Sequence, residues 1–370
     1  MTDAATVDDQ ELASAGQAQP AVPAADPAED APVDAPAERV GLRQRILKIA
    51  KLVFTVVIFV AIGYYLVTNW DAVRAAWETL TWTTMLLSTL AVLLGLAASS
   101  MAWRDAVRDI GNPVAFPAAA RVFVIGQLGK YVPGTVWVYL LQTELGRRAG
   151  VPRARAFLAS MTAMAIGIVA ALIVGVAALP VLITSSDAGL SYVRPVRIGL
   201  LSMIVVLPFA LIAIVPRVLT FLVSTALRVL RRPPLEAPLT WAGVLRILAW
   251  SIVTWLCYGA HLWLLFDGGV GDGLPAYLRC VGAVAVAVAV AMFFPTPSGV
   301  GGREGLLMAT MAPFVIGNRQ AEIAFGIAWA SRMIFFVAEL VGAGLAALTD
   351  LPGRWGRRRK TTPATEPVDS

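Results

Sequence analysis

Five ionisable residues stand in stretches that are otherwise apolar, and they are the first candidates for a binding site. They are Lys130, Arg303, Glu304, Arg332 and Glu339. A charged side chain at the centre of a bilayer costs about 2.5–3.5 kcal/mol on insertion scales, so each should face protein or water. The three cations together would suit a phosphate group. The two carboxylates would orient these cations or couple binding to protons.

Arg332 and Glu339 are seven residues apart, about two helical turns, and therefore share one face of a helix. Two interpretations stay open for them: an internal ion pair that is only structural, and the polar lining of a lipid headgroup site. For Lys130 and Arg303 we favour a functional role over a structural one, because each adjoins an interrupted apolar segment. Gln127 and Tyr131 belong to the same candidate site.

Proline and glycine interrupt two long apolar segments. The first interruption contains Pro133 and Gly134, and the second contains Pro295, Pro297, Gly299, Gly301 and Gly302. Backbone released from a helix costs several kcal/mol per group in lipid, so it must be buried in protein or line a wet cavity. Two ordinary proline kinks are the alternative. Two interruptions at matching positions, each with a charge beside it, favour a functional site.

Other chemistries find little support. His261 is the only histidine, and a lone histidine in a span is more often a hydrogen-bonded packing residue than a ligand. Cys257 and Cys280 lack metal-site spacing and are expected to be free packing residues. The glycine run at 299–302 has no Gly-Lys-Ser/Thr ending, so it is no nucleotide loop. We expect no enzyme activity, no metal and no cofactor.

The composition is that of a membrane protein. Of the 370 residues, 58% are hydrophobic and 15% charged, and the mean hydropathy is +0.73. A single soluble core cannot bury that much apolar surface. The net charge of +6 comes from arginines and lysines in short loops. These residues set membrane topology, so we expect no nucleic-acid binding. Residues 1–40 are acidic and rich in Ala and Pro, and should be disordered.

A spanning helix needs about 20 apolar residues. The candidate segments are 52–68, 83–102, 117–142, 156–180, 196–215, 243–266, 275–294, 304–316 and 322–348. Loop arginines and lysines put both termini in the cytoplasm. By the same rule, 117–142 begins and ends on the cytoplasmic side, and 275–316 begins and ends outside. The prediction is an all-α polytopic protein with six full spans and two re-entrant hairpins. Eight full spans is the alternative.

The two halves of the chain have matching patterns in opposite orientation. Residues 45–180 read as span, span, interrupted segment, span, and residues 195–350 repeat that order from the other side of the membrane. Inverted repeats with paired interruptions point to a transport site at their interface. Residues 351–370 form a basic tail that is predicted to be cytoplasmic. The richness in Ala, Arg and Val suggests a bacterial cell membrane.

The interrupted segments also resemble a known family. Gly-Lys-Tyr-Val-Pro-Gly-Thr-Val-Trp at 129–137 and Pro-Thr-Pro-Ser-Gly-Val-Gly-Gly-Arg-Glu at 295–304 are similar to elements of the flippase-like membrane domain of lysylphosphatidylglycerol synthases. Arg332 matches an arginine common in that family's last span. The resemblance covers about residues 45–350. The chain departs from it at 160–165, which lacks the family's Glu-Arg pair, and at Ser298, where glycine is usual.

The resemblance implies a standalone flippase-like protein without the soluble domain that transfers lysine from its tRNA. The leading hypothesis is a transporter that moves an anionic phospholipid or a polyprenyl-linked glycolipid between leaflets. The alternative is a membrane scaffold or accessory subunit of a cell-envelope glycosyltransferase or lipid synthase. A lipid-modifying enzyme ranks last, because the sequence offers no convincing set of catalytic residues.

Overall fold

The computed structural model describes residues 67, 70–78, 80–131, 136–183, 193–229, 238–291 and 299–349. The tails at 1–40 and 351–370 lie outside these residues, as does the predicted first span except for Val67. Pro133, Gly134, Pro295 and Pro297, in the middle of the two interrupted segments, lie outside them too. What was predicted for these parts stays a prediction.

Six helices in the described part of the chain are long and apolar enough to cross a membrane. Five coincide with predicted full spans: α3 (Trp82–Asp109), α6 (Arg153–Leu182), α7 (Val193–Ala213), α9 (Trp241–Phe266) and α12 (Gln320–Leu348). The sixth, α10 (Gly273–Ala291), is the first arm of the second interrupted segment. The chain is therefore an all-α polytopic membrane protein, as predicted, and no strand is assigned within the described ranges.

Large and small side chains separate onto different faces of these helices. Leu86, Leu90 and Leu94 recur every four residues of α3 and are exposed, which makes a lipid-facing stripe. Helices in lipid gain little from apolar burial alone, so their contacts rely on small residues. Gly259 of α9 is an example, because a Cβ there would lie 2.5 Å from the Cα of Val281 in α10.

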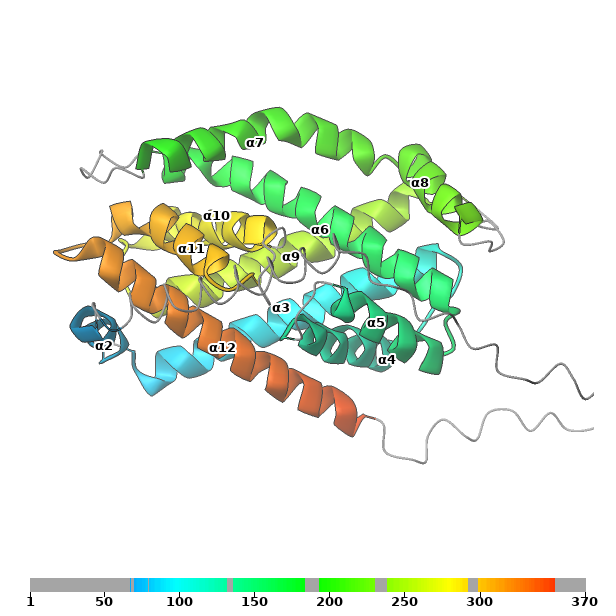
Figure 1. Cartoon of the computed structure of the whole chain (residues 1–370), viewed down its shortest axis with the longest axis horizontal. Helices are drawn as coiled ribbons and strands as arrows, with labels where there is room; N and C mark the ends of the chain where they lie inside the picture. Colours follow the sequence, from blue (N-terminus) through cyan, green and yellow to red (C-terminus); the bar gives the residue numbers. More distant parts are fainter. Residues whose placement is uncertain are drawn as a thin grey trace, which may run out of the picture. The chain divides into compact units, whose positions relative to one another are not determined.

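Helices α3 and α9 form an antiparallel pair. Asp109, the last residue of α3, accepts hydrogen bonds from the amide (3.0 Å) and the hydroxyl (2.7 Å) of Thr240, the N-cap of α9. At the other end, Ser88 of α3 contacts His261 of α9 at 2.6 Å. Helices α6 and α10 pack against α9, and α12 packs against α3 (Figure 1).

The first interrupted segment folds back on itself. Its first arm is α4 (Phe116–Ala120), a π-helix η1 (Arg121–Ile125) and a 3₁₀-helix η2 (Leu128–Tyr131), and its second arm is α5 (Trp137–Arg148). We call residues 116–148 the first hairpin. Its arms touch at Gly129, where a Cβ would lie 2.7 Å from the backbone nitrogen of Val138.

Helix α5 continues six residues beyond the predicted end at residue 142. The extension carries Glu144, which pairs with Arg147 and Arg148 at spacings of three and four residues. Such pairs support a helical turn that has few apolar residues. A search for apolar stretches therefore missed this turn.

The second interrupted segment also closes on itself. After α10 come α11 (Gly302–Met311) and the 3₁₀-helix η4 (Ala312–Phe314). The amide of Ile316, after η4, donates to the carbonyl oxygen of Gly269, before α10, at 2.9 Å. The two ends of this segment thus meet, and we call residues 269–316 the second hairpin. Its first arm, α10, is span-length, and its second arm is shorter.

The two hairpins open at opposite ends of the α3–α9 pair. The first is tied to the C-terminal end of α3, where Arg104 Nε donates to the Val114 carbonyl oxygen at 3.1 Å. The second closes at Gly269, just past the C-terminal end of α9. Because α3 and α9 are antiparallel, these are opposite ends.

Two shorter helices lie outside the predicted spans. Helix α2 (Trp70–Glu78) is held to α12 by a hydrogen bond of 3.0 Å from Trp77 Nε1 to the Gly326 carbonyl oxygen. Helix α8 (Pro216–Val229) buries Leu219, Val223 and Leu227, which recur every four residues. Apolar stripes of this kind are typical of helices that lie along a membrane surface. They are too short for a search for 20-residue spans.

Candidate functional site

Helix α12 joins the two hairpins through two buried side chains of opposite charge. Glu339, 1% exposed, forms an ion pair with Lys130 of the first hairpin and accepts a hydrogen bond of 2.9 Å from the Tyr131 hydroxyl. Arg332, two turns earlier, pairs with Glu304 of the second hairpin at 2.6 Å. Each residue of the predicted Arg332/Glu339 couple therefore holds a different hairpin.

Glu304 is held by the start of its own helix. Its second carboxylate oxygen accepts a hydrogen bond of 2.8 Å from the amide of Gly301, the N-cap of α11. Gly301 has φ 85°, a conformation that favours glycine. A carboxylate in the first turn also suits the positive end of the helix dipole. The Gly-Gly-Arg-Glu sequence thus aims Glu304 at Arg332.

Arg303 is buried without a carboxylate partner of its own. It is 8% exposed, and one of its Nη atoms donates to Ser331 Oγ at 3.1 Å. Its guanidinium group lies 4.1 Å from the centre of the Phe335 ring. Among the described residues, no carboxylate lies within ion-pair distance of Arg303, and its Nε has no hydrogen-bond partner.

A chain of hydrogen bonds leads from Arg303 to His261. Ser331 Oγ accepts from Arg303 and lies 2.8 Å from His261 Nε2, so its single proton is available to that nitrogen. His261 Nδ1 then carries the ring proton and donates to Ser88 Oγ at 2.6 Å, while the Ser88 hydroxyl donates to the His261 carbonyl oxygen at 3.0 Å. This network confirms that His261 is hydrogen-bonded within the protein.

A cavity of about 300 Å³ lies between the hairpins and helices α3, α6, α9 and α12. Among the described residues, those that line it with a charge are Lys130, Arg303 and Glu339. Other polar lining residues come from the first hairpin and from helices α3, α6 and α9: Ser99, Gln127, Tyr139, Gln142, Ser160, Ser251, Thr254 and Tyr258. The remaining lining is apolar, aromatic or glycine and includes Trp255 and Phe335.

The structure divides the predicted site residues into two groups. Gln127, Lys130, Gly299, Arg303 and Glu339 line the cavity. Tyr131, Gly301, Gly302, Glu304 and Arg332 are not part of its lining, although Tyr131, Gly301, Glu304 and Arg332 belong to the ion-pair networks behind it. Within the described residues, Lys130 pairs with Glu339 and Arg332 pairs with Glu304, so of the three predicted cations only Arg303 lacks a carboxylate within ion-pair distance there.

Sequence reasoning missed the hydroxyl groups of the cavity and the role of Ser331. Ser160, Ser251 and Thr254 donate to carbonyl oxygens of their own helices, four residues earlier, at 2.8–3.0 Å. A single serine in a span is unremarkable by itself. These hydroxyls stand out only when it is known that the helices turn them toward the same cavity. The sequence does not show how each helix is rotated about its axis.

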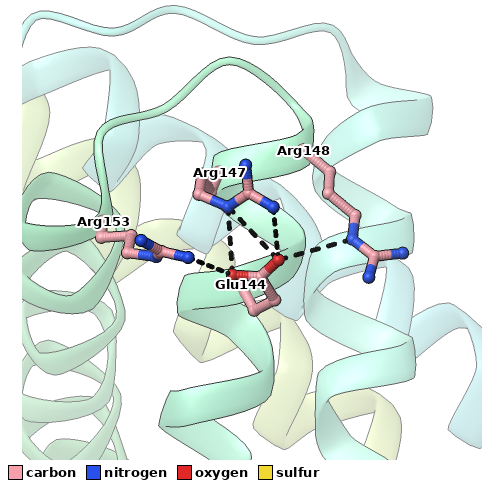
Figure 2. Close-up of polar contacts among 4 residues, drawn as sticks. All are labelled: Glu144, Arg147, Arg148 and Arg153. Carbon is pink, nitrogen blue, oxygen red and sulfur yellow. Dashed lines mark hydrogen bonds and ion pairs between the residues drawn. The ribbon is translucent and has the colours of Figure 1, made fainter. Parts of the chain in front are cut away.

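A second charged cluster lies at the turn between α5 and α6. Glu144 accepts from Arg147 at 2.6 Å and from Arg153 at 3.1 Å, and Arg148 lies 3.6 Å away (Figure 2). Hydrogen bonds from Arg147 and then Arg153 lower the pKa of Glu144 to about 2. The turn therefore keeps Glu144 ionised and carries an excess of positive charge.

Metal and thiol chemistry have no assembled site in the described residues. No group of three His, Cys, Asp or Glu side chains there is close enough to hold a metal ion. Cys257 and Cys280 are both free, as predicted.

Comparison with known protein families identifies one that matches most of the chain. A model described as the lysylphosphatidylglycerol synthase TM region matches residues 49–342. No individually curated protein matches the chain. The match covers both hairpins and all the charged residues of the cavity. Because it spans more than half of the sequence, the chain belongs to the family of the lysylphosphatidylglycerol synthase TM region.

Proposed function

We propose that this protein moves an anionic lipid between the two leaflets of a bacterial cell membrane and catalyses no covalent reaction. One observation carries the proposal: Arg303 is buried on the wall of a cavity between two hairpins and has no carboxylate partner among the described residues. A membrane protein rarely retains such a charge without a use for it.

The energetics of Arg303 favour an anionic ligand. Taking an ion out of water costs several kcal/mol even after the protein relaxes, and a nearby opposite charge offsets that cost. Phe335 and Ser331 supply only a ring face and one hydroxyl acceptor. A phosphate group in the cavity would supply the missing charge and accept several hydrogen bonds from the guanidinium fork.

The size of the cavity fits a headgroup and excludes a whole lipid. Ligand pockets hold about 300–1,000 Å³, and this cavity, at about 300 Å³, is at the lower end. The acyl or polyprenyl chains would therefore stay in the surrounding bilayer while the headgroup crosses through the protein.

The proposed topology has both termini in the cytoplasm and hairpins that enter from opposite faces. Support comes from the charges at the two hairpin openings. The first opens beside the arginine-rich turn that follows α5, and the second beside residues 267–274, which carry two aspartates and no basic residue. Inverted repeats of this kind place substrate sites between the two interrupted segments.

The test is lipid movement in vesicles. Reconstituted full-length protein should accelerate the exchange of a fluorescently labelled phosphatidylglycerol between leaflets, measured by dithionite quenching. The Arg303→Gln variant should lose most of this activity, and Arg153→Gln, which removes a surface arginine, should retain it. Exchange no faster than in protein-free vesicles, for phosphatidylglycerol and for a polyprenyl-linked sugar alike, would overturn the proposal.

The alternative is a scaffold or accessory subunit of a cell-envelope glycosyltransferase or lipid synthase. Helix α7 favours it, because Val205, Phe209 and Ile212 leave a broad apolar face exposed. Copurification with such an enzyme, and cellular function that survives neutralisation of Lys130, Arg303, Glu304 and Arg332, would support the scaffold and contradict transport.

A further inference from the structure

The charges on the cavity wall do not suit every anionic lipid equally. Among the lining residues that the structure describes, Lys130 and Arg303 are positive and Glu339 is negative, so this part of the lining carries one net positive charge. The pair of Arg332 and Glu304 behind it is neutral.

This balance selects a headgroup with one negative charge. A buried excess charge is costly whatever its sign, so the best ligand neutralises the lining and does not reverse it. A phosphodiester carries one charge. A phosphomonoester carries about 1.5 to 2 negative charges at neutral pH, and a diphosphate-linked lipid also exceeds one. A zwitterionic headgroup leaves Arg303 uncompensated.

The hydroxyl groups on α6 and α9 specify what the phosphodiester should carry. The hydroxyl protons of Ser160, Ser251 and Thr254 are directed to main-chain carbonyl oxygens. Ser160 Oγ also accepts from Trp103 Nε1 at 2.9 Å. What these groups offer the cavity is hydrogen-bond acceptors, because a hydroxyl has one proton and two lone pairs. They would bind donors on the ligand.

We propose that the cavity binds the headgroup of a phosphodiester lipid with a hydroxyl-bearing substituent, either glycerol or a single sugar. The phosphate contacts Arg303, and the ligand's hydroxyls donate to Ser160, Ser251 and Thr254. An ammonium would also satisfy the acceptors, but it would cancel the negative charge that Arg303 needs. The inference rests on the proposed lipid-handling function and narrows its substrate class.

Binding of short-chain lipids to the full-length protein in detergent tests this inference. The probes are dioctanoyl phosphatidylglycerol, dioctanoyl phosphatidylethanol, dioctanoyl phosphatidic acid and farnesyl-phosphate-linked glucose, titrated by calorimetry. Phosphatidylethanol is a phosphodiester without hydroxyls, so it separates charge from hydroxyl recognition. Phosphatidylglycerol or the phosphoglucose should bind about tenfold more tightly than phosphatidylethanol, which corresponds to two net hydrogen bonds. Whichever of these two lipids binds more tightly shows whether the natural headgroup carries glycerol or a sugar.

Variants assign the two parts of the recognition. Arg303→Gln should lower the affinities for phosphatidylglycerol and phosphatidylethanol by the same factor, about tenfold or more. The double variant Ser251→Ala and Thr254→Val should remove the preference for phosphatidylglycerol and leave the affinity for phosphatidylethanol unchanged. Ser202→Ala is the matched control, because this exposed serine of α7 also donates to a carbonyl oxygen of its own helix, at 2.7 Å. It should change neither affinity.

Several results would overturn the inference: equal affinity for phosphatidylglycerol and phosphatidylethanol, tighter binding of phosphatidic acid, or no binding of any probe. The results that reject this substrate class can be distinguished from those that reject transport. Lipid exchange without headgroup preference would keep transport and reject the substrate class. Selective binding without any exchange would keep the class and reject transport.

Discussion

Three charged residues of the cavity wall, Lys130, Glu339 and Arg303, have different roles. Glu339 neutralises Lys130 and is fixed further by the Tyr131 hydroxyl. Arg303 has no carboxylate within ion-pair distance in the described part of the chain. Ser331 accepts a hydrogen bond from its guanidinium group, His261 contacts Ser331 in turn, and the guanidinium lies over the Phe335 ring. Without Glu339, Lys130 would compete with Arg303 for an anionic ligand.

Removal of one member of the Lys130–Glu339 pair should cost more than removal of both. Glu339→Gln leaves Lys130, whose side chain is 23% exposed, without this carboxylate. Breaking a fully buried pair costs about 3–5 kcal/mol, and the partial exposure of Lys130 places this pair at or below the lower end of that range. The double variant Lys130→Met and Glu339→Gln should recover much of that loss. Thermal unfolding in detergent of the two single variants and the double variant measures the difference. Strictly additive effects would show that the pair contributes no coupling.

The surface cluster around Glu144 makes stability depend on pH in the acid range. The folded pKa of Glu144 is about 2, below its ordinary value of 4.5. A depressed carboxyl pKa stabilises the fold above 4.5, and this stabilisation is lost as the pH falls toward 2. Glu144→Gln should therefore lower the unfolding temperature at neutral pH, and the difference from the unaltered protein should shrink between pH 4.5 and 2. An equal difference at both ends of that range would contradict the prediction.

At the scale of elements, α12 sets the register of both hairpins. Its two charges are opposite in sign and two turns apart, and each pairs with a residue of the opposite sign in a different hairpin. A shift of either hairpin along α12 would bring like charges closer and leave a buried carboxylate unpaired. Buried ion pairs often contribute more to such specificity than to stability. We infer that these pairs hold the cavity in one arrangement.

The tight approach of the two arms of the first hairpin should not tolerate a methyl group. Gly129→Ala places a Cβ 2.7–2.9 Å from backbone atoms of Trp137 and Val138, so the arms must separate. Unfolding temperature and lipid exchange should both fall. Gly305→Ala is the matched control in the second hairpin, where a Cβ meets nothing within 4 Å. It should be neutral, or stabilising by up to about 1 kcal/mol from helix propensity. Equal losses in both variants would show that close packing at Gly129 is not the cause.

At the scale of the whole molecule, the proposed topology predicts which loops each side of the membrane can reach. In a background without Cys257 and Cys280, Arg148→Cys should react with a membrane-impermeant thiol reagent only from the cytoplasm. Asp272→Cys, between α9 and α10, should react only from outside. Intact cells and inverted vesicles supply the two directions. Labelling of both positions from the same side would exclude hairpins that enter from opposite faces.

The sequence by itself was enough to predict the class, five of the long helices and four of the buried charged residues, Arg303, Glu304, Arg332 and Glu339. These are local properties, because span length and hydropathy depend on consecutive residues. The sequence identified the three cations and the two carboxylates expected to orient them, but not which carboxylate pairs with which cation, since Lys130 and Glu339 are 209 residues apart and Arg332 and Glu304 are 28 apart. The rotation and depth of each helix decide such pairs, and packing across the bundle sets both. Tertiary structure alone therefore showed that, among the described lining residues, Arg303 is the cation without a carboxylate within ion-pair distance, and that hydroxyls from separate helices line the same cavity.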